Sequence, residues 1–159
     1  MTVIYESVEW IASFVEIFVL YKIYNVLFCR TRRLESEKID IALAVIGTVI
    51  TQFCNAIDIF SYYTMMVIVL YISICAAFIY KTGYITLFSI ASFYILSLGC
   101  FDFLIFTLVS NFYGGYDMFM ELISQAGVFR MVMLLAIKIL WILAYLGLKK
   151  YLYKFLLNK

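Results

Sequence analysis

The sequence contains no histidine and no proline among its 159 residues. Without histidine, the chain lacks the commonest metal ligand and the commonest general base near neutral pH. Without proline, it lacks the residue that most often kinks a helix, so its helices are expected to be fairly straight. Charged residues make up only 14% of the chain, whereas an ordinary soluble domain contains roughly 25%.

Motifs that carry catalysis or metal binding are also missing from the sequence. It has no HExxH, GxSxG or Walker pattern, and its four cysteines show no CxxC spacing. The pair Gly114-Gly115 is typical of a turn, and the serines of the fourth hydrophobic run have no neighbouring base. We therefore expect no enzymatic activity in these residues, no metal and no cofactor. The small net charge of +2 gives no indication of nucleic-acid binding.

Hydrophobic residues are present in excess, at 67% of the chain. A single water-soluble core cannot hide so many, so the solvent around the chain should be a lipid bilayer. Runs of about 20 apolar residues, each long enough to cross a bilayer as a helix, recur along the whole sequence. We predict an all-α polytopic membrane bundle, a single domain whose five transmembrane helices are Val8–Cys29, Ile39–Asp58, Ile59–Tyr80, Tyr84–Phe112 and Val128–Leu148.

Basic residues assign an orientation to these helices. The first and third connections and the tail carry all of the loop bases, namely Arg30, Arg32, Arg33, Lys38, Lys81, Lys149, Lys150, Lys154 and Lys159. An excess of lysine and arginine marks the cytoplasmic side of a membrane protein. We therefore expect a multi-pass protein of the cell membrane with its N-terminus outside and its C-terminus inside. Residues 113–127 then form an outer loop, and residues 149–159 form a basic cytoplasmic tail.

Four charged residues fall inside the predicted helices instead of at their ends, and one of them, Lys22, has a side chain long enough to reach toward the membrane surface. Glu16, Asp102 and Lys138 each lie well within a hydrophobic run, and at about 1.5 Å of rise per residue they reach a similar depth. Unpaired charges at that depth cost several kcal/mol each, so we expect the three to meet in a buried cluster. Such a cluster can be a structural clasp, a polar core that responds to a ligand, or a proton or ion relay.

A second group of polar residues lies toward the predicted outer side. The candidate ligand-binding residues are Gln52, Asn55, Asp58, Asp117, Glu121 and Arg130. The first three follow a polar stripe of the second helix that could line a pocket reachable from outside, or could form ordinary hydrogen bonds between helices. Arg130 could receive a ligand carboxylate, pair with an acid of the outer loop, or anchor its helix at the membrane surface.

The first and last predicted helices resemble those of a known family. Residues 8–33, VEWIASFVEIFVLYKIYNVLFCRTRR, have an acidic start, a glutamate among aliphatic and tyrosine residues, and a basic exit. Residues 129–150, FRMVMLLAIKILWILAYLGLKK, have an arginine at the start, a lysine in mid-helix and a basic exit. With the short-loop helices between them, these segments resemble the membrane region of AgrC-like, GHKL-type sensor histidine kinases of Gram-positive bacteria.

That resemblance implies a two-component, quorum-sensing type of sensor that recognises a secreted peptide outside the cell. It also implies a homodimer and a cytoplasmic kinase or response-regulator system as partners. Because the chain as far as Lys159 holds no phosphoacceptor histidine and no ATP-binding domain, the resemblance covers the sensor region alone. No kinase activity is expected of these residues.

The leading functional prediction is therefore a membrane sensor region that recognises an extracellular, peptide-type signal and passes it to a cytoplasmic signalling domain or partner. Two alternatives stay open. One is a small-molecule-binding membrane subunit of a transporter, which a bound small molecule would favour. The other is a structural membrane protein of the cell envelope, which would bind no ligand.

Overall fold

The computed structural model of the protein describes residues 2–28, 31–32, 37–57, 61–112, 114, 115, 117, 121 and 128–157. In this part of the chain the helices are α1 (Thr2–Leu27), α2 (Glu37–Ala56), α3 (Ser61–Ile79), α4 (Tyr84–Ser110) and α6 (Val128–Leu157). The predicted all-helical fold class is therefore confirmed. The predicted helix limits at Cys29, Asp58 and Ile59 lie outside the described residues, as does most of the predicted outer loop over residues 113–127.

Two helices are longer than predicted. α1 begins at Thr2 instead of Val8, and α6 continues to Leu157 instead of ending at Leu148. The prediction equated the limits of each hydrophobic run with the limits of its helix. Neither flanking segment contains a glycine or proline that would stop a helix, so helical structure continues into polar sequence at both places. Most of the predicted tail is therefore part of α6.

α2 and α4 match their predicted spans to within two residues at the limits that the structure describes. α2 begins at Glu37, whose carboxylate suits the partial positive charge at a helix N-terminus. α4 begins at Tyr84, as predicted, and ends at Ser110. Beyond it, Gly114 and Gly115 have φ angles of 85° and 116°, which glycine adopts without steric cost. The glycine pair therefore forms the turn that the sequence indicated.

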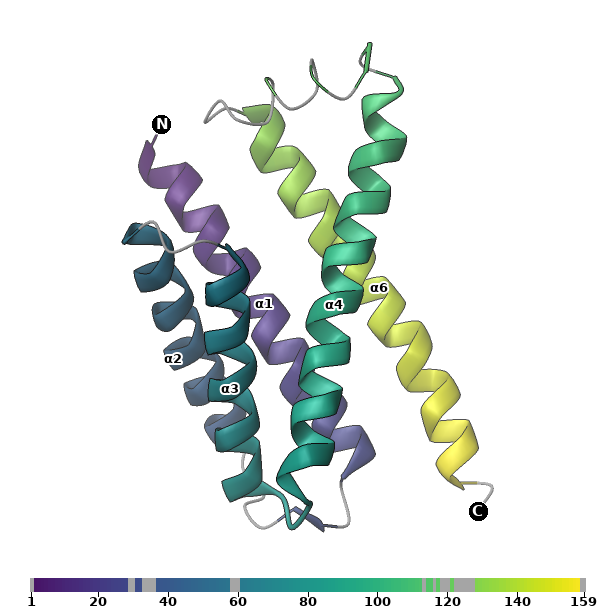
Figure 1. The fold of residues 1–159 in the computed structure, drawn as a ribbon. Helices are drawn as coiled ribbons and strands as arrows, with labels where there is room; N and C mark the ends of the chain where they lie inside the picture. The colour runs from purple at the N-terminus through teal and green to yellow at the C-terminus, as the bar shows by residue number, and fades with distance from the viewer. Residues whose placement is uncertain are drawn as a thin grey trace.

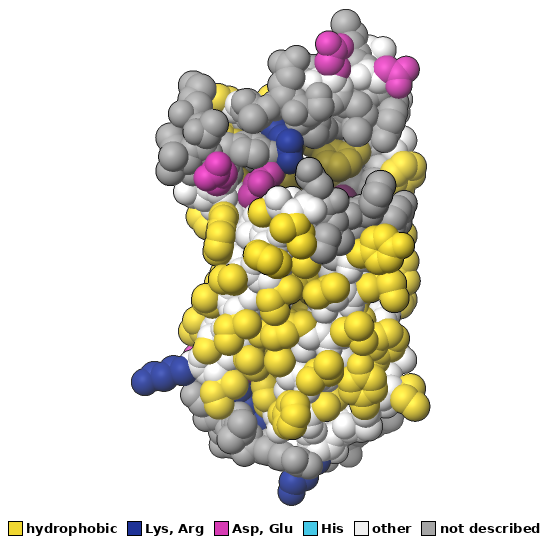
Figure 2. All heavy atoms as spheres, turned by 60° about the vertical axis from the view of Figure 1, so that its left-hand side comes forward, with side chains coloured by type: hydrophobic (Ala, Val, Ile, Leu, Met, Phe, Trp, Pro, Cys, Tyr) yellow, Lys and Arg dark blue, Asp and Glu magenta, His cyan; other side chains and the backbone are white. Residues whose placement is uncertain are grey.

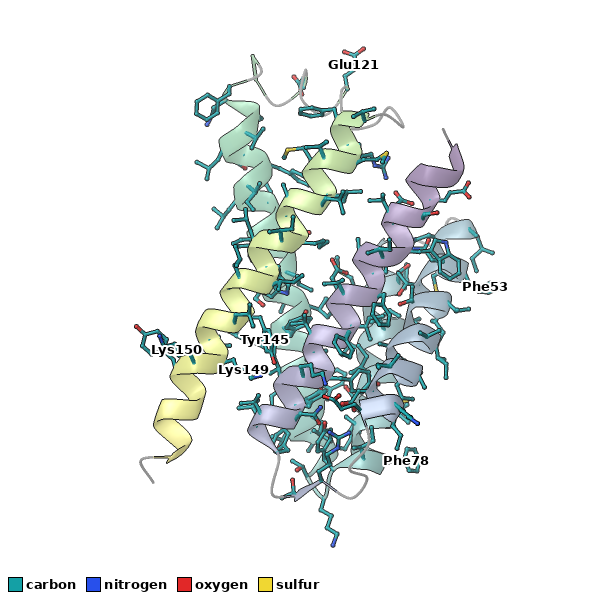
Figure 3. The ribbon with its side chains drawn as sticks, turned by 180° about the vertical axis from the view of Figure 1, so that it is seen from behind. Phe53, Phe78, Glu121, Tyr145, Lys149 and Lys150 are labelled. Atoms are coloured by element: carbon teal, nitrogen blue, oxygen red, sulfur yellow. The ribbon has the colours of Figure 1, made fainter. Side chains whose placement is uncertain are left out.

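Successive helices run in alternate directions, and α1 lies between α2 and α6 (Figures 1 and 3). α2 and α6 pack against α1, and α3 packs against α2 and α4. The start of α1, the end of α4 and the start of α6 lie together at what we call the upper end, following Figure 1. The lower end holds the end of α1, the start of α4 and the end of α6.

Apolar side chains cover the sides of the bundle. Four helical spans are long and apolar enough to cross a membrane, and α3 contributes a shorter apolar span over Tyr63–Ile79. On the face shown in Figure 2, hydrophobic side chains form a broad band, and charged side chains gather toward the two ends. Phe53 and Phe78, which are 65% and 72% exposed, point away from the bundle (Figure 3). A surface of this kind is suited to contact with lipid.

Close contacts in the interior join the central helices. Tyr24 of α1 is fully buried, and its hydroxyl donates to the backbone carbonyl of Leu87 on α4 at 2.6 Å. Its ring also packs against Tyr80, just after α3, with 5.8 Å between the ring centroids. At Gly47 of α2, an added Cβ would lie only 2.9 Å from Cδ1 of Ile17 on α1. The absence of a side chain there lets α1 and α2 approach closely.

A buried polar network closes the lower end of the bundle. Asp40 of α2 has no exposed surface, and its carboxylate accepts hydrogen bonds from Arg32 at 3.0 Å and from the Asn25 amide at 2.6 Å. The side-chain oxygen of Asn25 accepts in turn from Arg32 at 2.6 Å and from the Tyr80 hydroxyl. The network thus fastens α1, α2, the end of α3 and the first connection to one another.

Replacing Asp40 with alanine tests this network. The change leaves Arg32 and Asn25 without their carboxylate, and losing one partner of a buried ion pair costs about 3–5 kcal/mol. We expect a large fall in the Tm of the protein purified in detergent micelles. Glu37→Ala is the matched control, because Glu37 is also an α2 acid paired with a base, Lys22, but its side chain is 81% exposed. Equal falls in both variants would contradict the assigned role of Asp40.

Candidate functional site

Lys138, near the middle of the apolar helix α6, lies beside two carboxylates. The residue is only 7% exposed, and its ammonium group forms an ion pair with Glu16 of α1 and lies 3.8 Å from Oδ2 of Asp102 on α4. The structure thus brings together the three residues that were expected to meet because of their depth. We call them the charge triad. Because an isolated charge in an apolar medium costs several kcal/mol, the triad fixes α6 against α1 and α4.

Two further polar contacts hold α6 on either side of the triad. Toward the upper end, Arg130 donates a hydrogen bond to the carboxylate of Glu9 on α1 at 2.9 Å. Toward the lower end, the indole N–H of Trp141 donates to the Tyr94 hydroxyl at 3.0 Å, and that hydroxyl donates to the backbone carbonyl of Glu16 at 2.7 Å. Polar groups spaced along α6 therefore set the position of a helix that is otherwise apolar.

A cavity of about 200 Å³ lies next to the triad, among α1, α2, α3 and α4. Glu16 and Asp102 line this cavity and also contact Lys138. Its other polar lining residues are Ser13, Thr51, Asn55, Thr64 and Tyr94. Asn55 lies near the end of α2 and Thr64 near the start of α3, so the cavity extends into the upper half of the bundle (Figure 1). We call it the upper cavity.

Two polar atoms of this wall have no hydrogen-bond partner within the described part of the chain. They are Oγ1 of Thr64, a residue that is 7% exposed, and Oδ1 of Asp102. Each buried polar atom left unpaired costs about 1–3 kcal/mol, so a ligand that supplies these hydrogen bonds is favoured. The triad itself contains two carboxylates and one ammonium group. A cationic or hydrogen-bond-donating group is therefore the best match for the upper cavity.

The structure places the predicted ligand-binding residues in different environments. Asn55 lines the upper cavity. Gln52 donates instead to a side chain of α1 at 3.3 Å, which is the interhelical hydrogen bond considered as the alternative. Asp117 is exposed, and Glu121 points away from the helices at the upper end (Figure 3). Asp58 lies outside the described residues. The five candidate residues that the structure describes therefore do not form one pocket.

Arg130 has a partner that the sequence reasoning did not consider, namely Glu9. A pattern that predicts the pairing of Arg130 with Glu9 is nevertheless present in the sequence. Glu9 and Glu16 lie about two turns apart on one face of α1, and Arg130 and Lys138 lie about two turns apart on α6. Because α1 and α6 run in the same direction (Figure 1), the two acids and the two bases can pair in order. The matched spacing predicts both ion pairs once the two helices are known to be neighbours.

Comparison with protein-family models, curated proteins and solved structures gives no match for this chain. Among the described residues, no group of three or more histidine, cysteine, aspartate or glutamate residues is placed to hold a metal ion. What the site could bind is therefore inferred from its geometry alone. The lining of the upper cavity suits a cationic or donor group, which would lie against the two carboxylates that contact Lys138.

The link between α1, α4 and α6 is tested by Tyr94→Phe. Without the hydroxyl, the Trp141 N–H and the Glu16 carbonyl lose a partner, and we expect the free energy of unfolding to fall by about 1–3 kcal/mol. Tyr84→Phe on the same helix is the matched control, because Tyr84 is 42% exposed. Denaturant titration followed by circular dichroism measures both variants. A loss for Tyr94→Phe no larger than for the control would show that the hydroxyl does not join these helices.

Proposed function

We propose that this chain is a membrane sensor region that recognises an extracellular, peptide-type ligand and transmits its presence through α6 to a cytoplasmic signalling domain or partner. One observation carries the proposal. Glu16 and Asp102 hold Lys138 of α6, and the same two residues line the upper cavity. A cationic ligand group in the cavity therefore competes with the contact that fixes α6.

Five membrane crossings, with the N-terminus outside and the C-terminus inside, agree best with the arrangement of the helices. α3 has 19 residues, and at about 1.5 Å per residue it is nearly as long as the roughly 30 Å apolar core of a bilayer. The alternating helices bring Arg32 and Lys81 to the lower end, where α6 also ends (Figure 1). Basic residues favour the cytoplasmic side, which makes the lower end cytoplasmic and directs the upper cavity outward.

The size of the upper cavity limits what the ligand can place inside it. Pockets for drug-sized molecules usually measure about 300–1,000 Å³, and this cavity has about 200 Å³. It therefore accepts a group the size of one side chain, such as a lysine ammonium, and excludes a whole peptide. The remainder of a peptide would stay at the upper end, where Asp117 and Glu121 are exposed. These acids attract the same positive charge as the cavity.

Competition for the two carboxylates gives the ligand a preference between two arrangements of α6. A ligand shifts a conformational equilibrium only by binding one state more tightly, and here it binds more tightly when Lys138 has moved away. α6 is continuous from Val128 to Leu157, so a displacement at its middle is carried to its lower end. A kinase or response-regulator system there, alone or in a homodimer, would receive the signal.

The small volume of the upper cavity also favours a second candidate, the small-molecule-binding membrane subunit of a transporter. The two candidates differ in the state of the purified protein. A transporter subunit that captures its substrate tightly should copurify with a stoichiometric, non-lipid small molecule, which mass spectrometry detects after denaturation. The sensor should release no such molecule when it is prepared without signal.

A tethered ligand group tests the sensor proposal. Gly99 lines the upper cavity, and a Cβ added there meets no atom within 4 Å. In Gly99→Lys the new side chain begins about one helical turn from Asp102, so its ammonium group can reach the carboxylate, and we expect it to compete with Lys138 and loosen α6. The distance between spin labels at the exposed positions Ile11 and Val132 is measured in a background without the native cysteines. Compared with the parent protein, we expect a longer mean distance and a broader distribution.

Gly99→Met is the matched control for this experiment, because methionine adds similar volume without charge. We expect its distance distribution to resemble that of the parent protein. Identical distributions for the lysine, methionine and parent proteins would show that the cavity is not coupled to α6.

A further inference from the structure

A second cavity, of about 570 Å³, lies among α1, α4 and α6. Its lining is mainly apolar and includes Ile23, Leu27, Ile90, Phe93, Ala144 and Leu148. α6 meets α4 at Trp141, whose ring packs against Tyr94 and Phe101. Below that contact the two helices diverge toward the lower end (Figures 1 and 3). The cavity occupies this widening space, and we call it the lower cavity.

Four polar side chains that line the lower cavity are already engaged in hydrogen bonds. Ser89 and Ser97 donate to backbone carbonyls of their own helix, at 2.8 Å and 2.7 Å, and the Trp141 N–H donates to the Tyr94 hydroxyl. An apolar cavity is a poor site for water, because a water molecule needs two or more polar partners. The wall therefore favours an occupant that is apolar along its whole length.

The lower cavity lies at the level of the membrane where the first part of a lipid acyl chain lies. On α6 its lining runs from Trp141 to Leu148, which is about 10 Å of helix at about 1.5 Å per residue. The apolar span of α6 ends shortly afterwards, at Tyr151. In a bilayer the cavity therefore lies within one leaflet, next to the headgroup level, where the first part of an acyl chain lies.

A basic side chain stands beside this cavity on the same side of α6. Lys149 follows Tyr145, which lines the cavity, by about one turn, so both share one face of the helix. Lys150 shares the face of Leu143 and Leu146, which are 58% and 51% exposed. Figure 3 shows the same difference, with Lys149 directed toward the neighbouring helices and Lys150 away from them. Lys149 is thus placed to meet the headgroup of a lipid whose chain enters the cavity.

We propose that the lower cavity binds an acyl chain of an anionic phospholipid whose phosphate group pairs with Lys149. The apolar wall accounts for the chain, and the lysine accounts for the preference for an anionic headgroup. A chain in this position lies between α6 and the other two helices, so the lipid sets their separation at the lower end. This inference rests on the membrane placement proposed above and is independent of the ligand of the upper cavity.

Native mass spectrometry of the purified chain in detergent micelles tests the proposal. The protein is titrated with phosphatidylglycerol or with phosphatidylcholine that carries identical acyl chains, and the lipid-bound fraction is measured. We expect tighter binding of phosphatidylglycerol. Lys149→Gln should weaken that binding about fivefold, as expected for the loss of one lysine near an anionic headgroup, and should leave phosphatidylcholine binding unchanged. Lys150→Gln is the matched control and should change neither.

Filling the cavity tests the acyl-chain part of the proposal. Ala144→Trp should reduce the binding of both lipids, and the milder Ala144→Leu should give an intermediate loss if the larger residue disturbs folding. Equal effects of the two lysine variants would overturn the headgroup contact, and undiminished binding by both Ala144 variants would overturn the cavity as the site.

The lipid-binding experiments and the sensor experiment test different sites. The Gly99 variants test the coupling between the upper cavity and α6, whereas the lysine and Ala144 variants test lipid binding at the lower cavity. Lipid binding can therefore fail while the response of α6 to Gly99→Lys persists. A chain that stayed monodisperse without detergent would instead overturn the membrane placement, and both proposals with it.

Discussion

The pairing of Lys138 with Glu16 and Asp102 is the interaction on which the position of α6 depends. In lipid an apolar helix gains little by choosing one apolar neighbour over another, because the acyl chains are as apolar as its own side chains. Charged groups supply the missing specificity, since separating them in a medium of low dielectric constant is costly. The contacts of Lys138, together with those of Arg130 and Trp141, thus define where α6 packs against its neighbours, which its apolar side chains alone would not do.

The two sides of the bundle are held in different ways. α1, α2 and the end of α3 share the buried network around Asp40, whereas α6 is held at and above its middle and diverges below Trp141 (Figure 1). A polar cavity lies on one side of this attachment and an apolar cavity on the other. Both are bordered by residues that touch or belong to α6. In the two proposals, α6 is therefore the helix that a ligand or a lipid would move.

Most features that depend on a single segment could be predicted from the sequence, apart from the extended start of α1 and end of α6. Of the features that join several segments, the triad could be predicted, but the Asp40 network and the cavities could not. The helices and the common depth of the triad follow from run length and helical rise. The Asp40 network was missed, because an acid in the first turn of a helix is ordinary and its burial depends on how the connection folds back onto Tyr80. The cavities depend on helix crossing angles, which arise from side-chain packing between helices. For this reason Asn55 is among the lining residues of the upper cavity and Glu121 is not.

A double-mutant cycle between Glu16 and Lys138 tests the central role of the triad most directly. Glu16→Gln, Lys138→Met and the double variant are unfolded in bicelles, and the three losses in the free energy of unfolding are compared with the parent protein. We predict a coupling energy of about 0.5–3 kcal/mol, as found for residues in one salt-bridge network, so that the double variant loses less than the two single variants together. Losses that add to within about 0.5 kcal/mol would show that these charges do not hold α6 in place.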